Sequence, residues 1–190
     1  MDAADEAGAS DGASQLIHVL DGPREIDAMT PRELQRALFD ALEELVAKDR
    51  YLLEHDLSER CIATRIAIYL QPRCGAYTVD VEYNRKGESP KRLGLPADCS
   101  NFRDANGESL VVPDLIVHTR GEAGPNLLVV EVKKTTNAEG PDCDRERVQA
   151  FLSNLGYRCG ALVECETRAG RSPCTRVEWY EGGRGRATRG

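Results

Sequence analysis

The fold of this 190-residue chain is decided by residues 111–134, which read VVPDLIVHTRGEAGPNLLVVEVKK. Two runs rich in β-branched residues, 111–119 and 127–134, flank a turn that contains Gly121 and Gly124. Two such runs around a glycine-containing turn predict a β-hairpin. Because both runs are almost continuously apolar, we expect them to be central strands of a sheet.

Three charged residues interrupt these apolar strands: Asp114 in the first run, and Glu131 and Lys133 in the second. Alternation along a strand places Glu131 and Lys133 on one face, and the hairpin can bring Asp114 beside them. Two carboxylates can bind a hard divalent cation such as Mg²⁺ or Mn²⁺, which polarises a phosphate and acidifies a bound water. A neighbouring lysine can orient that water or stabilise developing charge. The alternative is that both carboxylates are ordinary strand-end residues, with Lys133 as a salt-bridge partner.

The flanking segments predict a succession of helices and strands. Thr30 and Glu33 form a capping box, Asp142 or Asp144 can cap a later helix, and Gly156 can end it. The expected elements cover residues 30–48, 56–70, 77–83, 111–119, 127–134, 142–155, 159–165 and 175–180. This order predicts an α/β fold in which a mixed central β-sheet is flanked by α-helices.

The hairpin also resembles a known signature, carried by Val112-Pro113-Asp114-Leu115-Ile116-Val117 and Val129-Val130-Glu131-Val132-Lys133. Both runs are similar to the signature of the PD-(D/E)XK, or restriction-endonuclease-like, superfamily. The common core of that superfamily runs helix, three strands, helix, strand. The expected elements have the same order over about residues 56–165, so the resemblance implies a restriction-endonuclease-like core.

The resemblance also implies roles for individual residues. Asp114 and Glu131 would be the metal ligands and Lys133 the catalytic lysine. The helix before the first strand often supplies a further acidic residue in this superfamily, and Glu59 matches that position as an auxiliary catalytic residue and ligand. The alternative for Glu59 is a capping-box partner of Asp56 at the helix start.

Residues 84–110 have no periodicity, and a loop of this length is often mobile or functional. Its first part contains four basic residues that we consider as phosphate contacts of a bound nucleic acid. They are Arg85, Lys86, Lys91 and Arg92. The alternative is that they simply face solvent. Of the other polar strand residues, His118 is expected to be a polar core residue or to line the site.

The net charge of −7 opposes nucleic-acid binding by the overall field of the protein, so such binding must depend on a local basic surface. Acidic residues with Ala, Gly and Ser dominate residues 1–28, which we interpret as a disordered acidic tail. Residues 182–190 are interpreted as a flexible basic tail. A single domain is therefore expected over residues 29–181.

The seven cysteines include no C-x-x-C pair, and their odd number argues against a disulfide framework and a zinc ribbon. No apolar run is long enough to span a membrane, and the chain start lacks the pattern of a signal peptide. We expect a cytoplasmic protein with reduced thiols and no membrane partner.

These observations favour a Mg²⁺- or Mn²⁺-dependent nuclease that acts on nucleic acid, with DNA as the expected substrate. The alternative is an inactive member of the same fold that serves as a binding or assembly module. A metal-dependent hydrolase of another phosphate substrate is the third possibility. No separate recognition domain is visible, so specificity would come from loops, from a second copy of the chain, or from a protein partner.

Overall fold

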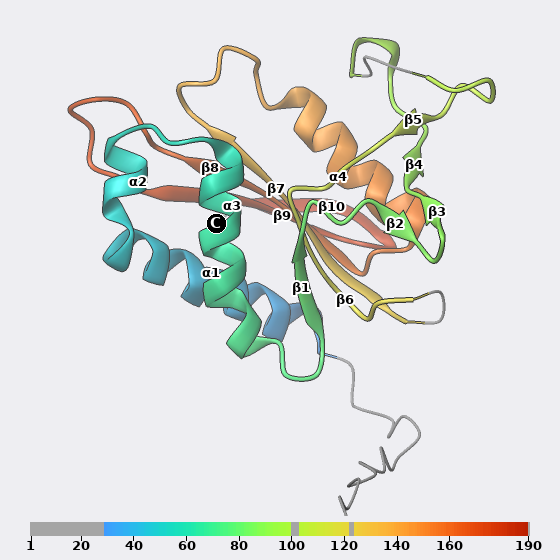
Figure 1. Ribbon diagram of the computed structural model, residues 1–190, viewed down its shortest axis with the longest axis horizontal. Coiled ribbons are helices and arrows are strands. Elements are labelled where there is room, and N and C mark those ends of the chain that lie inside the picture. The colour runs from blue at the N-terminus through green and yellow to red at the C-terminus, as the bar shows by residue number, and fades with distance from the viewer. Residues whose placement is uncertain (1–28, 100–102, 122–123, 190) are drawn as a thin grey trace, which may run out of the picture.

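The computed structural model describes residues 29–99, 103–121 and 124–189, and the expected acidic tail over 1–28 lies outside them (Figure 1). Its centre is a six-stranded mixed sheet in the order β1-β6-β7-β8-β9-β10. Neighbouring strands are antiparallel except β7 and β8, which are parallel. The strands are β1 (Thr78–Val81), β6 (Leu115–His118), β7 (Asn126–Lys134), β8 (Cys159–Cys165), β9 (Thr175–Glu181) and β10 (Arg184–Arg189). The expected α/β class with a mixed sheet is confirmed.

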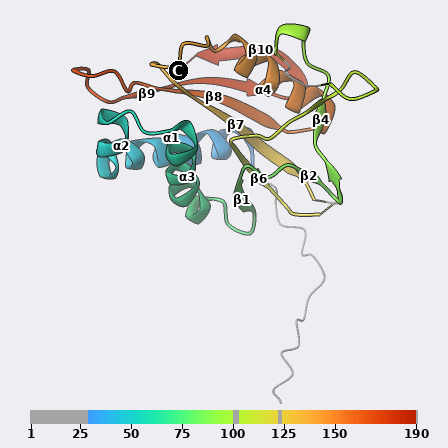
Figure 2. The same ribbon diagram turned by 45° about the horizontal axis from the view of Figure 1, so that its top comes forward.

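Helices cover both faces of this sheet (Figure 2). One face is packed by α1 (Pro31–Lys48) and α3 (Glu59–Leu70), with the short α2 (Arg50–Glu54) between them and η1 (Gln71–Arg73) after them. The other face is packed by α4 (Asp142–Leu155), which forms the crossover between the parallel strands β7 and β8. Alternation along β7 sends Val130 and Val132 into the core below α1 and α3, and Val129 into the core below α4. None of the described helices is long and apolar enough to cross a membrane.

The helix boundaries follow local signals. Thr30 and Glu33 form the expected capping box of α1, and Gly156 ends α4 in the left-handed conformation. The N-cap of α3 is Ser58, whose side chain accepts from the Cys61 N–H. The expected capping of α4 by Asp142 or Asp144 is wrong, because Pro141 holds the N-cap position and both aspartates lie inside the first turn.

The described residues of segment 84–110 form short elements, of which those at residues 92–93 and 97–99 contact α4. The short elements are β2 (Arg85–Lys86), β3 (Ser89–Pro90), β4 (Arg92–Leu93), η2 (Ala97–Cys99) and β5 (Ser109–Leu110). Leu93 and Leu95 are buried in the same core cluster as Phe151 of α4 and Val129 of β7, which joins the segment to the α4 face of the sheet. The segment expected to be a long loop without periodicity therefore contains short strands in its described residues.

The segment 182–190, expected as a flexible basic tail, contains a strand in its described residues, and Gly190 lies outside them. After a turn at Gly182 and Gly183, β10 pairs with β9 as an edge strand, with Thr188 opposite Trp179. Main-chain hydrogen bonds hold such a strand, so a pattern of apolar residues is not needed to form it.

The position of α4 on the sheet depends on close approach at Gly160 of β8. A Cβ atom at Gly160 would lie 2.5 Å from Val148 Cγ1, so Gly160→Ala forces the helix away from the strand. We expect a loss of about 1–3 kcal/mol in the free energy of unfolding, measured by denaturant titration. Gly94→Ala is the control, since an added methyl there meets nothing within 4 Å. Equal free energies of unfolding for the two variants would show that α4 does not pack closely on Gly160.

Candidate metal and phosphate site

Strand pairing brings the three sequence-predicted residues to one place on the α4 face of the sheet. Leu115 pairs with Val130, so one step further Asp114 lies opposite Glu131. Glu131 and Lys133 have the same parity along β7 as Val129, which faces α4. The main-chain N–H of Val132 donates to Asp114 Oδ2 at 2.8 Å and fixes the first carboxylate against β7.

Helix α4 adds two charged residues to this cluster. Because α4 follows β7 directly, its first turns lie over the end of that strand. Arg147 Nε donates to Glu131 Oε2 at 3.2 Å, and Arg147 Nη2 also donates to Asp144 Oδ1. Lys133 Nζ lies 3.1 Å from Asp144 Oδ2. Asp114, Glu131, Lys133, Asp144 and Arg147 therefore form one connected group, which we call the carboxylate cluster.

Burial and mutual repulsion disfavour charge on the two strand carboxylates. Burial raises the pKa of Asp114 to about 6, although the Val132 N–H and Arg147 oppose the shift. Burial, together with the negative charge of Asp114, raises the pKa of Glu131 well above its ordinary value. Burial alone lowers the pKa of Arg147, but the charges of Glu131, Asp144 and Asp114 outweigh it and raise that pKa. The cluster thus contains excess negative charge that a further cation would relieve.

Glu131 carries the clearest sign of an incomplete site. Its side chain is only 3% exposed, and within the described part of the chain Oε1 has no hydrogen-bond partner. A buried carboxylate oxygen without a partner is costly, and a bound cation would satisfy it. Across the described residues, no group of three or more His, Cys, Asp or Glu side chains is arranged to hold a metal. Two carboxylates still fit Mg²⁺, which proteins often bind through one or two carboxylates together with waters and substrate phosphates.

Glu59 is close to the carboxylate cluster but is engaged elsewhere. Its Oε1 accepts from the Lys134 main-chain N–H at 2.9 Å and from Asn137 Nδ2 at 3.0 Å. Its charge nonetheless contributes to the raised pKa of Asp114. These contacts tie the start of α3 to the end of β7, and Ser58 rather than Asp56 provides the side-chain cap. A role for Glu59 as a ligand stays a prediction.

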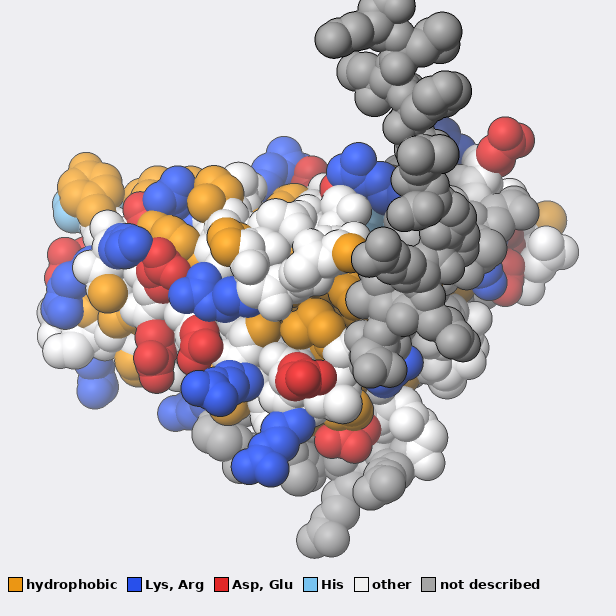
Figure 3. Space-filling view, turned by 90° about the horizontal axis from the view of Figure 1, so that it is seen from below, with side chains coloured by type: hydrophobic (Ala, Val, Ile, Leu, Met, Phe, Trp, Pro, Cys, Tyr) orange, Lys and Arg blue, Asp and Glu red, His pale blue; other side chains and the backbone are white. Residues whose placement is uncertain are grey.

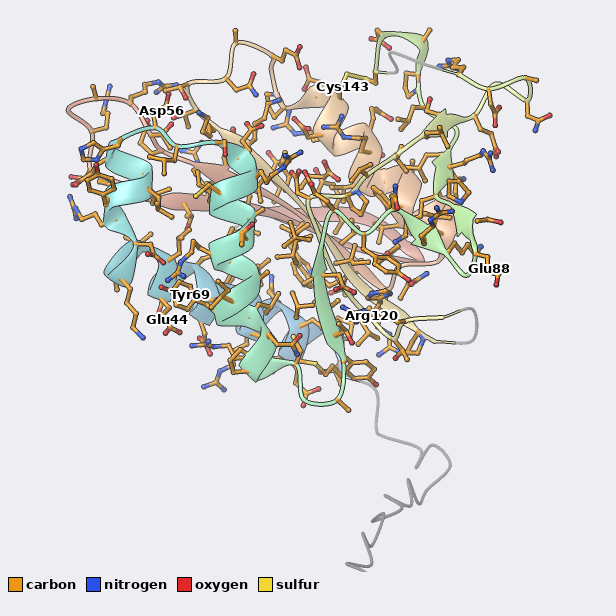
Figure 4. The ribbon with its side chains drawn as sticks, viewed as in Figure 1. Glu44, Asp56, Tyr69, Glu88, Arg120 and Cys143 are labelled. Atoms are coloured by element: carbon orange, nitrogen blue, oxygen red, sulfur yellow. A yellow bond between two sulfur atoms is a disulfide. The ribbon has the colours of Figure 1, made fainter. Side chains whose placement is uncertain are left out.

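A pocket of about 350 Å³ opens beside the cluster and is lined by Lys133, Asp144 and Arg147, but not by Glu131. The pocket is also lined by Cys99 and Cys143, which form a disulfide. The expectation that all thiols are reduced is therefore wrong for this pair, whose members are 44 residues apart in sequence. The disulfide joins η2 to the N-terminal end of α4, where Figure 4 labels Cys143.

The four basic residues predicted to contact phosphate do not form one surface. Lys91 is buried, with Nζ donating to the Tyr83 carbonyl at 2.8 Å, and burial lowers its pKa to about 8. This finding corrects its assignment as a phosphate contact. Arg92 forms an ion pair with Asp104, while Arg85 and Lys86 are exposed in β2. Figure 4 shows Glu88, at the tip of the β2–β3 hairpin, well apart from Cys143 at the head of α4.

His118 lies at the other end of β6 and belongs to a separate polar group. Its Nε2 is 2.9 Å from Asp80 Oδ2, and Asp80 also accepts from Arg120 Nε at 2.8 Å. The ring of Tyr83 packs on the imidazole. The expectation of a polar core residue is confirmed for His118, and these contacts place it outside the carboxylate cluster.

The pKa shifts predict a pH dependence of stability. The folded protein holds protons on Asp114 and Glu131 more tightly than the unfolded chain, whose carboxyls titrate near 3.8 and 4.5. Below these values both states are protonated and the burial has no electrostatic cost. As pH rises from about 4 to about 6, the unfolded chain loses the Asp114 proton before the folded protein does, so the stability of the metal-free protein falls over this range.

Asp114→Asn removes the loss of stability that ionisation of Asp114 causes. The variant should gain stability over wild type as pH rises from about 4 to 7, by up to about 3 kcal/mol, since one pKa unit is worth roughly 1.4 kcal/mol. Thermal unfolding in a chelating buffer across this range measures the difference. A difference that does not change with pH would contradict the raised pKa of Asp114.

Asp144 and Arg147 are the functional candidates that the sequence did not reveal. The sequence marks Asp144 only as a possible helix cap and does not single out Arg147, but the two residues lie three positions apart and so share one face of α4. That spacing, together with the position of α4 immediately after the strand of Glu131 and Lys133, is the sequence signal that could have identified them.

No protein-family model, curated protein or solved structure matches this chain.

Proposed function

We propose that this protein is a Mg²⁺- or Mn²⁺-dependent nuclease with a restriction-endonuclease-like core, whose reaction centre is the carboxylate cluster. The observation that carries this proposal is the unpartnered, buried Oε1 of Glu131 opposite a second carboxylate, Asp114. The order α3-β1-β6-β7-α4-β8, with β7 and β8 parallel, supports the same core. DNA is the proposed substrate class.

In the proposed mechanism, Asp114 and Glu131 hold the cation, with Glu59 as a candidate auxiliary group. The bound ion would neutralise phosphate charge and acidify the attacking water. Lys133 extends from the same strand face and lines the pocket, so its ammonium can hold that water or stabilise the charge that develops on the phosphate. Asp144 holds the ammonium in place through the contact at 3.1 Å.

The charge of the protein limits how it can hold a nucleic acid. On the face shown in Figure 3, Lys and Arg side chains are interspersed with Asp and Glu side chains. Of the four basic residues considered for binding, Arg85 and Lys86 are exposed and are the phosphate contacts in this proposal, although Arg85 also donates to the Glu88 carbonyl at 2.9 Å. A second copy of the chain or a protein partner would then supply further affinity, in the cytoplasm as expected.

A binding or assembly module is the second candidate, and one observation favours it. Arg147 and Lys133 already pair with Glu131 and Asp144, so the cluster is partly neutralised without a metal. A module of this kind would retain its charged groups as a buried ion-pair network. It would show no metal-dependent stabilisation and no cleavage.

Thermal unfolding with and without Mg²⁺ or Mn²⁺ separates these candidates. A ligand at about 100 times its Kd stabilises the folded state by roughly 2.7 kcal/mol, so a raised Tm is expected for wild type. Asp114→Asn should remove most of this shift. Asp80→Asn is the matched control, because Asp80 binds His118 and Arg120 at the far end of β6.

Incubation of the same proteins with plasmid, single-stranded DNA and RNA tests the reaction itself. We expect metal-dependent cleavage of DNA by wild type and by Asp80→Asn, and none by Asp114→Asn. An equal metal-induced Tm shift in all three proteins would refute the metal site. No metal-induced Tm shift and no cleavage of any of these nucleic acids by wild type would instead favour the binding module.

A further inference from the structure

Arg147 separates Glu131 from the pocket. The pocket is lined by Arg147, Lys133 and Asp144, whereas the Glu131 carboxylate is buried and bonded to Arg147 Nε at 3.2 Å. The Arg147 side chain is 32% exposed and lines the pocket while its Nε contacts Glu131, so it lies between the pocket and that carboxylate. A cation that enters from the pocket therefore meets the guanidinium before it reaches Glu131.

The Arg147 guanidinium also balances the carboxylate charge that a bound metal ion would balance. It interacts with the charges of Glu131, Asp144 and Asp114 at once. A divalent ion between Asp114 and Glu131 would compete for the same carboxylate and repel the guanidinium. Arg147 and the metal are thus alternative counterions for Glu131.

We propose that Arg147 is a phosphate-binding residue that Glu131 holds in the metal-free protein and that metal binding releases toward the pocket. This inference rests on the proposed function and assigns a substrate contact that the hairpin motif does not include. Asp144 accepts from Arg147 Nη2 and remains its anchor after Glu131 is lost. A guanidinium has five N–H donors in a planar fork that matches two phosphate oxygens, so donors remain for a phosphodiester.

The release of Arg147 from Glu131 can be followed in wild-type protein by NMR of the arginine side chains during titration with Mg²⁺. The Nε–H signal of Arg147 should shift as its bond to Glu131 is replaced. Arg145 is an internal control on the same helix, because its Nε donates at 2.8 Å to Glu178, away from the cluster. The Arg145 signal should not move.

Arg147→Met gives an independent measure of the competition. Removal of the competing cation should tighten Mg²⁺ binding about tenfold, the size of a typical coupling between sites. With Ca²⁺ in place of Mg²⁺ to suppress cleavage, the same variant should bind a short DNA duplex more weakly. The salt dependence of that binding should fall by about one unit of slope, as expected for one lost phosphate contact. Arg145→Met should keep wild-type affinity for both ligands.

The outcomes distinguish this inference from the proposed function. If wild type binds no Mg²⁺, both are overturned. If Mg²⁺ binds but the Arg147 signal stays in place, only the release of Arg147 is overturned, and the wild-type spectrum decides this even if Arg147→Met does not fold. Unchanged duplex affinity and salt slope in a folded Arg147→Met variant overturn the phosphate contact.

Discussion

Replacing Lys133 by methionine is expected to lower DNA cleavage on the order of 10³-fold, the typical effect of removing one donor that stabilises transition-state charge. Methionine keeps much of the buried stem and removes the ammonium. Lysine is not a metal ligand, so the Mg²⁺-induced Tm shift should persist. Asp144 loses one partner but keeps Arg147, which limits the cost to stability. Initial rates on plasmid DNA and thermal unfolding measure the two effects.

Lys134→Met is the matched control for this change. Lys134 follows directly in β7 but has the opposite parity, and its ammonium pairs with Asp56 at 3.0 Å instead of with the cluster. The Lys134→Met variant should cleave DNA at the wild-type rate. Cleavage by Lys133→Met at the rate of Lys134→Met would refute the role of Lys133 in the reaction.

Glu131→Gln is expected to abolish both cleavage and metal-induced stabilisation while leaving the metal-free protein at least as stable as wild type at neutral pH. The carboxylate is buried and its pKa is raised, so ionised Glu131 destabilises the fold. A neutral amide of the same shape removes that cost and still offers an oxygen to Arg147. It provides only a weak ligand for Mg²⁺, which prefers charged oxygen donors.

Glu178→Gln should give the opposite pattern. Glu178 is also buried, but both of its carboxylate oxygens accept from Arg145, at 2.7 and 2.8 Å. Loss of this paired charge should lower Tm, and the Mg²⁺-induced shift should remain. Destabilisation of the metal-free protein by Glu131→Gln, with an intact metal response, would indicate that Glu131 is only a structural ion-pair partner.

The parts of the fold that depend on local signals could be predicted from the sequence. The β-branched runs around Gly121 and Gly124 predict the β6–β7 hairpin, the capping box at Thr30 predicts the start of α1, and Gly156 predicts the end of α4. The same hairpin places Asp114 opposite Glu131, because alternation and register follow from strand pairing. The centre of the candidate site therefore follows from one stretch of the chain.

The parts that depend on tertiary packing could not be predicted. Lysine is normally a surface residue, but Lys91 is buried, and its ammonium lies 4.7 Å from the centre of the Tyr83 ring. Cys99 and Cys143 are brought together only when η2 packs on α4. Arg147 is one of several charged residues in its helix, and only the crossover geometry directs it to Glu131.

The position of a bound ion shows whether Asp114 and Glu131 form a metal site. Crystals of wild-type protein soaked in Mn²⁺, with diffraction data collected at the manganese absorption edge, locate the metal without reference to activity. We expect an anomalous peak between Asp114 and Glu131, at roughly 2.1 Å from their carboxylate oxygens, with Arg147 displaced toward the pocket. A Glu131 carboxylate still bonded to Arg147, with no anomalous peak beside it at saturating Mn²⁺, would refute the proposed metal site.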